Sequence, residues 1–270
     1  MSDFPATAPT VGEDPEALLA LAVAAARGAG ALLRERYEAG PERSVHAKST
    51  PTDLVSEADL AAERSIHDVL EAARPHDGFL GEESGEGSAG DSGLRWVVDP
   101  LDGTINYLFS IPQWCVSVAV QDEQGTLAGA IFDPLRDELH TALRGGAPML
   151  NGRPVSASRR DRLEEAMVAT GFAYDASVRS RQADVLTRLL PRVRDVRRLG
   201  SAALDLAWTA AGRYDAYFER TTKPWDVAAG ALLCACAGLE VLDLDEHLGL
   251  PGGILAAPAA LAGPLLELVG

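Results

Sequence analysis

The segment at residues 96–106, WVVDPLDGTIN, constrains this chain more than any other. Its apolar start is typical of a short buried strand, and two aspartates and a Gly-Thr turn follow directly. If a helix begins at Gly103 or Thr104, the unpaired backbone N–H groups of its first turn form a site for a phosphate oxygen. Two carboxylates about 4 Å apart repel by roughly 4 kcal/mol at an effective dielectric of about 20, and a phosphate adds to that repulsion. The segment therefore predicts a divalent cation between Asp99, Asp102 and the anion.

Two further acidic segments favour the same interpretation. Residues 81–84, GEES, follow an apolar run and place Glu82 and Glu83 at a strand end, and residues 223–230, KPWDVAAG, place Asp226 at the entrance to an alanine-rich helix. Each has a simpler explanation, a solvated turn for the first and a helix N-cap for the second, and Asp-Pro and Asp-Gly are themselves common turn dipeptides. Carboxylate oxygens suit magnesium, manganese or calcium better than zinc, and none of the five histidines lies in the central motif.

The composition narrows the class of partner. The 270 residues include 40 Asp and Glu against 24 Lys and Arg, a formal net charge of -16, which is opposite to the usual charge of proteins that bind nucleic acid or anionic membranes. We therefore expect neither as a partner. Three cysteines without a C-x-x-C pair do not favour a disulfide framework, and we expect them to be reduced and buried. There is no basic-then-apolar leader and no uninterrupted apolar run of about 18 residues, so we expect a cytoplasmic protein.

The periodicity of apolar residues predicts the order of the elements. Residues 1–13 are expected to be a disordered tail, and Asp14-Pro15 to begin a helix that runs to about residue 37. Ser56 with Asp59 begins a second helix. Short β-rich runs at 96–98, 115–120 and 127–132 predict an antiparallel sheet. Beyond residue 155, predicted strands at 166–170, 214–218, 239–242 and 254–257 alternate with helices at 178–190, 201–211 and 227–237. The sequence thus predicts an α/β fold with two halves, 14–155 and 156–270.

Taken in this order and at these separations, GEES, WVVDPLDGTIN and WDVAAG resemble the inositol monophosphatase family, and the resemblance runs from about Asp14 to the C-terminus. It implies the layered α-β-α-β-α sandwich of that family and a magnesium requirement, with two or three ions per site and manganese as a substitute. It also implies inhibition by lithium and, in most members, a homodimer.

The resemblance also implies a ligand set. Glu82, Asp99 and the backbone carbonyl of Leu101 match the ligands of a first metal ion. Asp99, Asp102 and Asp226 match those of a second, and Glu82 also faces a third, weaker site.

Further positions match the parts that hold phosphate, water and substrate. Gly103 and Thr104 match the phosphate-holding turn, and Asp53 matches the acid that pairs with the threonine beside the attacking water. Catalytic roles are therefore implied for Asp53, Glu82 and Thr104. The residues for which a substrate contact is implied are Asp102, Gly103, Thr104, Ser201, Ala202, Glu219 and Asp226.

The implied reaction is hydrolysis of a small polyol phosphate by in-line attack of magnesium-activated water, without a phosphoenzyme. The family match favours inositol monophosphate as the substrate. Histidinol phosphate, fructose 1,6-bisphosphate and phosphoadenosine phosphate stay open, because relatives act on them with the same motif. A regulatory, partner-binding role is the alternative from another class. A cluster of arginines, at residues 192, 194, 197 and 198, is interpreted as a solvated face that could also attract phosphate or contact a second subunit.

Overall fold

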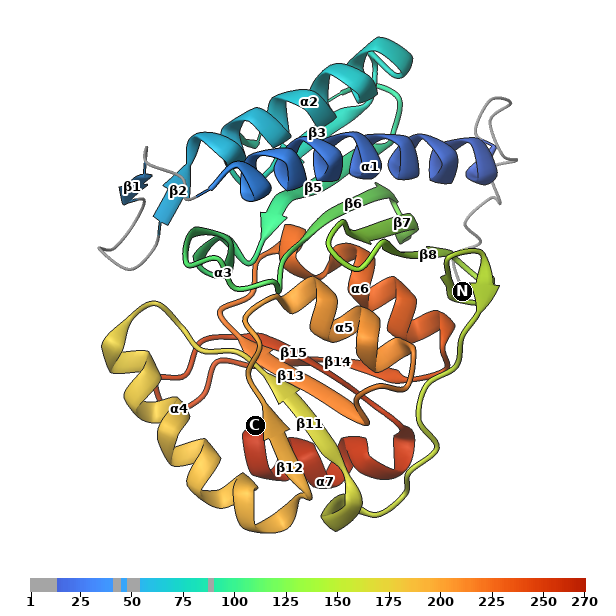
Figure 1. The fold of residues 1–270 in the computed structure, drawn as a ribbon. Coiled ribbons are helices and arrows are strands. Elements are labelled where there is room, and N and C mark those ends of the chain that lie inside the picture. The colour runs from blue at the N-terminus through green and yellow to red at the C-terminus, as the bar shows by residue number, and fades with distance from the viewer. Residues whose placement is uncertain (1–13, 41–44, 48–53, 87–89) are drawn as a thin grey trace.

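The computed structural model describes residues 14–40, 45–47, 54–86 and 90–270. The two main sheets and the helices around them form five layers, α-β-α-β-α (Figure 1). The predicted α/β sandwich is confirmed. The helices are α1 (Pro15–Ala39), α2 (Glu57–Ala73), α3 (Thr104–Leu108), α4 (Ala176–Leu189), α5 (Ala202–Ala210), α6 (Pro224–Cys236) and α7 (Ala259–Val269).

The larger sheet has eight strands, in the order β10-β9-β8-β7-β6-β5-β3-β4, and the smaller has five, in the order β12-β11-β13-β15-β14. All neighbours in the larger sheet pair antiparallel except β3 and β5, which run parallel. A separate pair, β1 with β2, precedes α2. The strands of the first half are β1 (Val45–Ala47), β2 (Leu54–Ser56), β3 (Gly78–Gly81), β4 (Gly85–Glu86), β5 (Arg95–Asp102), β6 (Cys115–Asp122), β7 (Gly125–Asp133), β8 (Glu138–Leu143), β9 (Met149–Leu150) and β10 (Arg153–Pro154). Those of the second half are β11 (Met167–Thr170), β12 (Asp195–Arg197), β13 (Ala216–Arg220), β14 (Glu240–Leu244) and β15 (Gly253–Ala257).

Three hydrophobic cores hold the layers together, because each sheet buries both faces. One core lies between α1, α2 and the larger sheet, a second between the two sheets around α5 and α6, and a third between the smaller sheet, α4 and α7. Strand β5 shows how alternation serves two cores: Trp96 and Val98 belong to the first and Val97 to the second. This packing fixes β5, which carries the predicted aspartates, in the interior of the molecule.

Helix α1 begins where the sequence predicts. The Asp14 side chain accepts a hydrogen bond from the Glu16 backbone N–H, and Pro15 occupies the first turn. The helix is 25 residues long, and it is the one helix of the described residues that is long and apolar enough to cross a membrane by length and composition. Its apolar face, however, includes Leu18, Ala22 and Leu33, which are buried in the first core, as in a core helix.

Several elements escaped the prediction. Among them are the strands β4, β8 and β12 and the helix α7. Helix α7 contains Gly263 and Pro264, which weaken a helical pattern, yet its Leu261, Leu265 and Val269 are buried in the third core. Packing of this kind outweighs local propensity.

The cysteines are free, as predicted. Cys115 and Cys234 are buried, but Cys236 is only partly buried, so the prediction of burial was wrong for that residue, which lies near the C-terminal end of α6.

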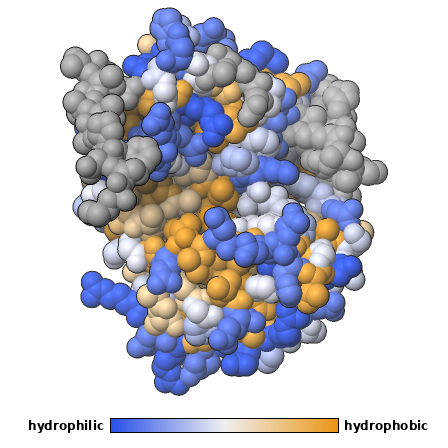
Figure 2. All heavy atoms as spheres, turned by 180° about the vertical axis from the view of Figure 1, so that it is seen from behind, coloured by the Kyte–Doolittle hydropathy of each residue, from blue (hydrophilic) through white to orange (hydrophobic). Residues whose placement is uncertain are grey.

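The surface of the molecule is not uniformly polar. Figure 2 shows one face on which hydrophobic side chains gather in the middle, with hydrophilic side chains along its upper and lower edges. The large apolar side chains with the greatest exposure in the described part of the chain are Leu248 and Phe109.

Two glycines of α1 give a matched test of this packing. A Cβ built on Gly30 would lie 2.6 Å from a ring carbon of the buried Phe132, whereas Gly28, on the exposed side, has nothing within 4 Å. Either substitution by alanine removes the unfavourable helix propensity of glycine. We expect Gly28→Ala to raise the free energy of unfolding by about 0.5–1 kcal/mol, and Gly30→Ala to lower it by about 1–2 kcal/mol through overpacking. Urea titration of both variants measures the difference, and equal effects would contradict the proposed contact.

Candidate active site

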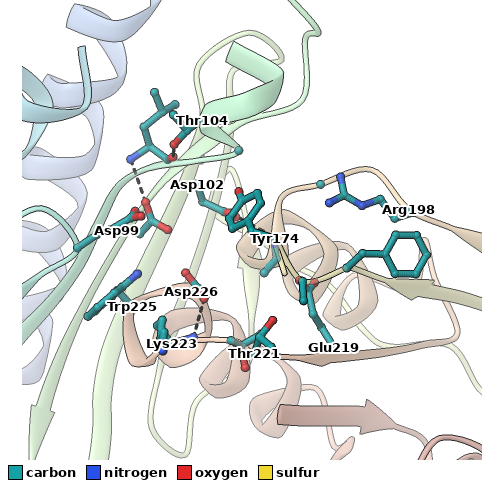
Figure 3. A pocket seen from close by; sticks show the side chains of 18 of the residues that line it. Asp99, Asp102, Thr104, Tyr174, Arg198, Glu219, Thr221, Lys223, Trp225 and Asp226 are labelled. Carbon is teal, nitrogen blue, oxygen red and sulfur yellow. Dashed lines mark hydrogen bonds between the residues drawn. The ribbon is translucent and has the colours of Figure 1, made fainter. Parts of the chain in front are cut away.

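A pocket of about 380 Å³ lies between the two halves of the chain, and Figure 3 shows side chains from both halves pointing into it. Of the predicted site residues, those that line it are Glu82, Asp99, Leu101, Asp102, Gly103, Thr104, Ala202, Glu219 and Asp226. Residues separated by more than a hundred positions in the sequence thus share one cavity. Ser201 is buried directly behind it, and Asp53 lies outside the described residues.

An irregularity in β5 brings the two central aspartates to the same side. Asp99 lies opposite Ser117 of β6 and Asp102 lies opposite Cys115, so three steps along β5 match two along β6. In a regular strand, side chains three residues apart point to opposite faces. The extra residue is a β-bulge, which bends the strand and turns Asp102 toward the pocket that Asp99 lines. Pro100 lies within this irregular stretch, where a missing backbone donor costs little.

Backbone and hydroxyl donors hold each aspartate in place. The Asp102 carboxylate accepts hydrogen bonds from the Ser201 hydroxyl at 2.6 Å and from the Ala203 backbone N–H at 2.7 Å. Asp99 accepts one from the Leu101 backbone N–H at 3.0 Å, and Asp226 accepts one from the Lys223 backbone N–H at 2.6 Å. The donors to Asp102 come from the N-terminal turn of α5, where the helix dipole also favours a negative charge.

The environment nevertheless disfavours the charged forms of these acids. Burial raises the pKa of Asp99 well above its usual range, and repulsion from Glu82, Asp102 and Asp226 raises it further. Burial raises the pKa of Asp102 to about 6 in spite of its hydrogen bonds. Burial followed by repulsion from Asp102 raises the pKa of Asp226 well above its usual range. A cluster of carboxylates with raised pKa values in a cavity is typical of a functional site.

Thr104 has an acid partner that the sequence analysis did not single out. Its hydroxyl donates to Asp59 at 2.9 Å and lies 3.1 Å from the carbonyl oxygen of Leu101. Asp59 is fully buried in the first turn of α2, where it also accepts hydrogen bonds from the backbone N–H and the hydroxyl of Ser56. The sequence reasoning gave the role of threonine partner to Asp53, and treated Asp59 only as part of a helix start. The contact that the structure describes is with Asp59.

The second half of the chain supplies the opposite wall. Glu219 of β13 accepts a hydrogen bond from the Tyr217 hydroxyl at 2.9 Å. Burial raises its pKa to about 7, while that hydrogen bond and nearby Arg198 lower it. Ala202 lines the pocket, whereas the hydroxyl of Ser201 is directed to Asp102. The substrate contact implied for Ser201 stays a prediction.

Other lining residues were not predicted as site residues. Phe172, Tyr174 and Arg198 line the pocket, and so does Thr221, a β-branched residue with a positive φ of 72°. Such a conformation is strained in any residue but glycine, and strain of this kind gathers at functional sites. A single sequence shows no signal for the first two, and backbone strain cannot be read from residue types.

The donor set fits a divalent cation. Four carboxylates and a backbone carbonyl, those of Glu82, Asp99, Asp102, Asp226 and Leu101, are hard oxygen ligands. The raised pKa values of the three aspartates reflect burial and a concentration of negative charge that a cation would relieve. Among the described residues, however, no three acidic, histidine or cysteine side chains already surround a single point closely enough to hold an ion. The carboxylates of the pocket repel one another, and a bound cation would be needed to draw them close enough to act as ligands of one ion.

The fold and the site place the chain in the inositol monophosphatase family, and the chain belongs to that family, whose model matches residues 14–269. It is a phosphatase. The chain is 42% identical over 273 residues to the inositol-1-monophosphatase of Mycobacterium leprae, across 94% of this chain and 93% of that protein. It is 40% identical over 242 residues to a protein of Escherichia coli named Nus factor SuhB, across 88% and 90%. The crystal structure of extragenic suppressor protein suhB from Bartonella henselae superposes with a TM-score of 0.86 at 38% identity, across 94% of this chain and 98% of that one.

The raised pKa values predict how stability depends on pH. The pKa of Asp102 is about 6 in the native state and 3.8 as its unperturbed value, so the native protein without metal binds more protons than the unfolded chain between these values. Its free energy of unfolding therefore falls as the pH rises through that window. In a chelating buffer, we expect Asp102→Asn to gain stability relative to the native sequence as the pH is raised from 4 to 7. Thermal unfolding of both proteins across this range measures the effect, and parallel curves would contradict it.

Proposed function

We propose that the chain hydrolyses the phosphate ester of a small polyol, inositol monophosphate first of all, in a reaction that requires magnesium. The observation that carries the proposal is the convergence of Glu82, Asp99, Asp102 and Asp226 on one pocket beside the Gly103-Thr104 turn. Metal-dependent phosphatases need such a carboxylate set to hold cations against a phosphate. Membership of the inositol monophosphatase family supports the same substrate class.

Two sets of ligands are proposed for magnesium, or manganese in its place. Glu82, Asp99 and the Leu101 carbonyl would hold one ion, and Asp99, Asp102 and Asp226 a second, with Glu82 also facing a third. When bound, these ions would lower the pKa of the attacking water and offset the negative charge of the phosphoryl and leaving oxygens. Lithium is expected to inhibit by competing for one of these positions.

The chain's own residues would orient the water and the substrate. Thr104, held by Asp59, would orient the attacking water, because its hydroxyl oxygen keeps a lone pair for a further hydrogen bond. The buried Asp59 carboxylate then fixes the direction of the hydroxyl proton. Ala202, Glu219 and Asp226 would contact the polyol. Ser201, whose predicted substrate contact is kept, would also position the Asp102 carboxylate through its hydroxyl.

A partner-binding role is the second candidate. The relative from Escherichia coli carries the name of a Nus factor, and at 40% identity it is almost as similar to this chain as the 42% identical inositol-1-monophosphatase of Mycobacterium leprae. We also propose a soluble, cytoplasmic homodimer. The hydrophobic side chains gathered on the face in Figure 2 support a self-association surface.

A substrate panel tests the function. Phosphate release is measured from inositol 1-phosphate, histidinol phosphate, fructose 1,6-bisphosphate and phosphoadenosine phosphate, with and without magnesium. We expect inositol 1-phosphate to be turned over fastest and only with magnesium. Asp102→Asn should lose roughly 10²-fold or more of kcat, and the exposed Asp184→Asn should lose none. Preference for another ester would change the assigned substrate and keep the assigned reaction. No phosphate release from any ester would favour the partner-binding role instead.

The Thr104–Asp59 contact gives a separate prediction. Asp59→Asn should lower kcat by roughly 10²-fold. The carboxylate accepts from Thr104 on one oxygen and from Ser56 on the other, whereas an amide has a single acceptor oxygen and cannot serve both. The magnesium concentration at half-maximal activity should stay within about twofold, since Asp59 is not a proposed ligand. Asp68→Asn, an exposed position on the same helix, is the control. A large shift in magnesium dependence would instead make Asp59 part of the metal site.

A further inference from the structure

A second buried acid of α2 binds the turn that carries a proposed metal ligand. Glu63 lies four residues after Asp59, so both side chains lie on the same face of the helix. Glu63 is 6% exposed, and its carboxylate accepts hydrogen bonds from the backbone N–H groups of Glu83 and Ser84, both at 2.8 Å. Glu63 does not line the pocket, whereas Glu82, which directly precedes those two N–H groups, does.

Strand pairing alone does not fix the turn that carries Glu82. The turn joins β3 to β4, and these strands pair with each other at two positions. Strand β4 has two residues and is the outermost strand of the larger sheet. So short a hairpin is at most marginally stable by itself. On the side of β5, the Glu82 N–H donates to the Val98 carbonyl oxygen at 3.2 Å, and the carboxylate of Glu63 binds the next two N–H groups of the chain.

The helix and the sheet hold Glu63 against this turn. A Cβ built on Gly81 would overlap the Glu63 carboxylate and would lie 2.8 Å from a ring carbon of Phe79, so a side chain at that position would displace the carboxylate. Phe79 of β3 and Ile66 of α2 are both buried in the first core, which packs α2 on the larger sheet (Figure 1). The position of Glu63 is therefore set by apolar packing that does not depend on the turn.

Contacts of this kind decide where a metal ligand lies. Two successive backbone N–H groups that point at one acceptor form a concavity that binds an anion, and an ionised carboxylate binds such donors more strongly than a neutral oxygen does. The direction of the Glu82 side chain depends on the backbone of the turn. Because metal–ligand distances tolerate only small deviations, a shift of the turn would remove Glu82 from the ligand set.

We propose that Glu63 is a positioning residue, which fixes the turn at residues 82–84 so that Glu82 is placed to bind a divalent cation. The inference rests on the proposed function, in which Glu82 is a metal ligand, and it extends the site by a residue outside the pocket. Asp59 and Glu63 would then give one face of α2 two tasks, the first acid orienting Thr104 and the second orienting Glu82. Neither acid would touch the metal.

Calorimetric titration of the metal-free, full-length protein with manganese tests the inference. We expect Glu63→Gln to weaken manganese binding roughly tenfold, because the amide keeps one acceptor oxygen for two N–H donors. Glu71→Gln, the same change at an exposed position of α2, should leave the affinity within about twofold of the native value. In a Glu82→Gln background, Glu63→Gln should weaken binding no further, because the ligand through which it acts has already been removed.

Hydrogen exchange of the metal-free protein gives a second measurement, which does not depend on metal binding. The backbone N–H groups of Glu83 and Ser84 should exchange roughly tenfold faster in Glu63→Gln than in the native chain, and at the native rate in Glu71→Gln. Gly81→Ala disturbs the same contact from β3, so it should also weaken manganese binding, and it carries the test if Glu63→Gln does not fold. Thermal unfolding of each variant shows which of them are folded.

Three results would overturn the inference while the proposed function stands. These are an unchanged manganese affinity in Glu63→Gln, a loss of affinity that is equally large in the Glu82→Gln background, and unchanged exchange of the two N–H groups. A native chain that binds no manganese and releases no phosphate from any ester would instead overturn the proposed function, and this inference with it.

Discussion

Repulsion between carboxylates is the constraint on which the rest of the structure depends. Asp99 and Asp102 are buried, with 2% and 9% of their surface exposed, and Asp226 faces them from the other half of the chain. Taken out of water and close together, such groups destabilise a fold unless something compensates them. The pocket concentrates negative charge that the folded chain alone only partly offsets, and a divalent cation is the simplest compensation that also serves a phosphate ester.

The scaffold supplies the partial compensation. The bulge in β5 aims two aspartates at one place, the first turn of α5 donates hydrogen bonds to Asp102, and the Lys223 N–H donates to Asp226. These elements come from different layers of the fold. The second core, which packs α5 and α6 between the two sheets, therefore sets the geometry of the site as well as the stability of the molecule. The packing of apolar residues remote from the pocket thus fixes the positions of the proposed cation ligands.

Much of the fold and of the candidate site could be predicted from the sequence, and the features that could not be predicted were missed for physical reasons. Alternating apolar residues revealed β5, β6 and β7, and the acidic motifs revealed Glu82, Asp99, Asp102 and Asp226 as a group. The family resemblance, rather than periodicity, predicted the five layers. The bulge could not be seen, because a spacing of three residues in a strand ordinarily means opposite faces. Asp59 was missed because its partner Thr104 is 45 positions away, and local patterns report only a helix start. Four neighbouring arginines look alike in sequence, and only the fold shows that Arg198 is the one that lines the pocket.

The most direct test of this account is calorimetric titration of the metal-free protein with manganese near pH 7, repeated in buffers of different ionisation enthalpy. The account predicts that at least two ions bind per chain and that protons are released, since acids with raised pKa values must lose them to become ligands. Asp99→Asn, which removes the one carboxylate shared by both proposed sites, should abolish most of the binding. Absence of binding by the native chain, or binding that Asp99→Asn leaves unchanged, would contradict the claim that these buried acids form a metal site.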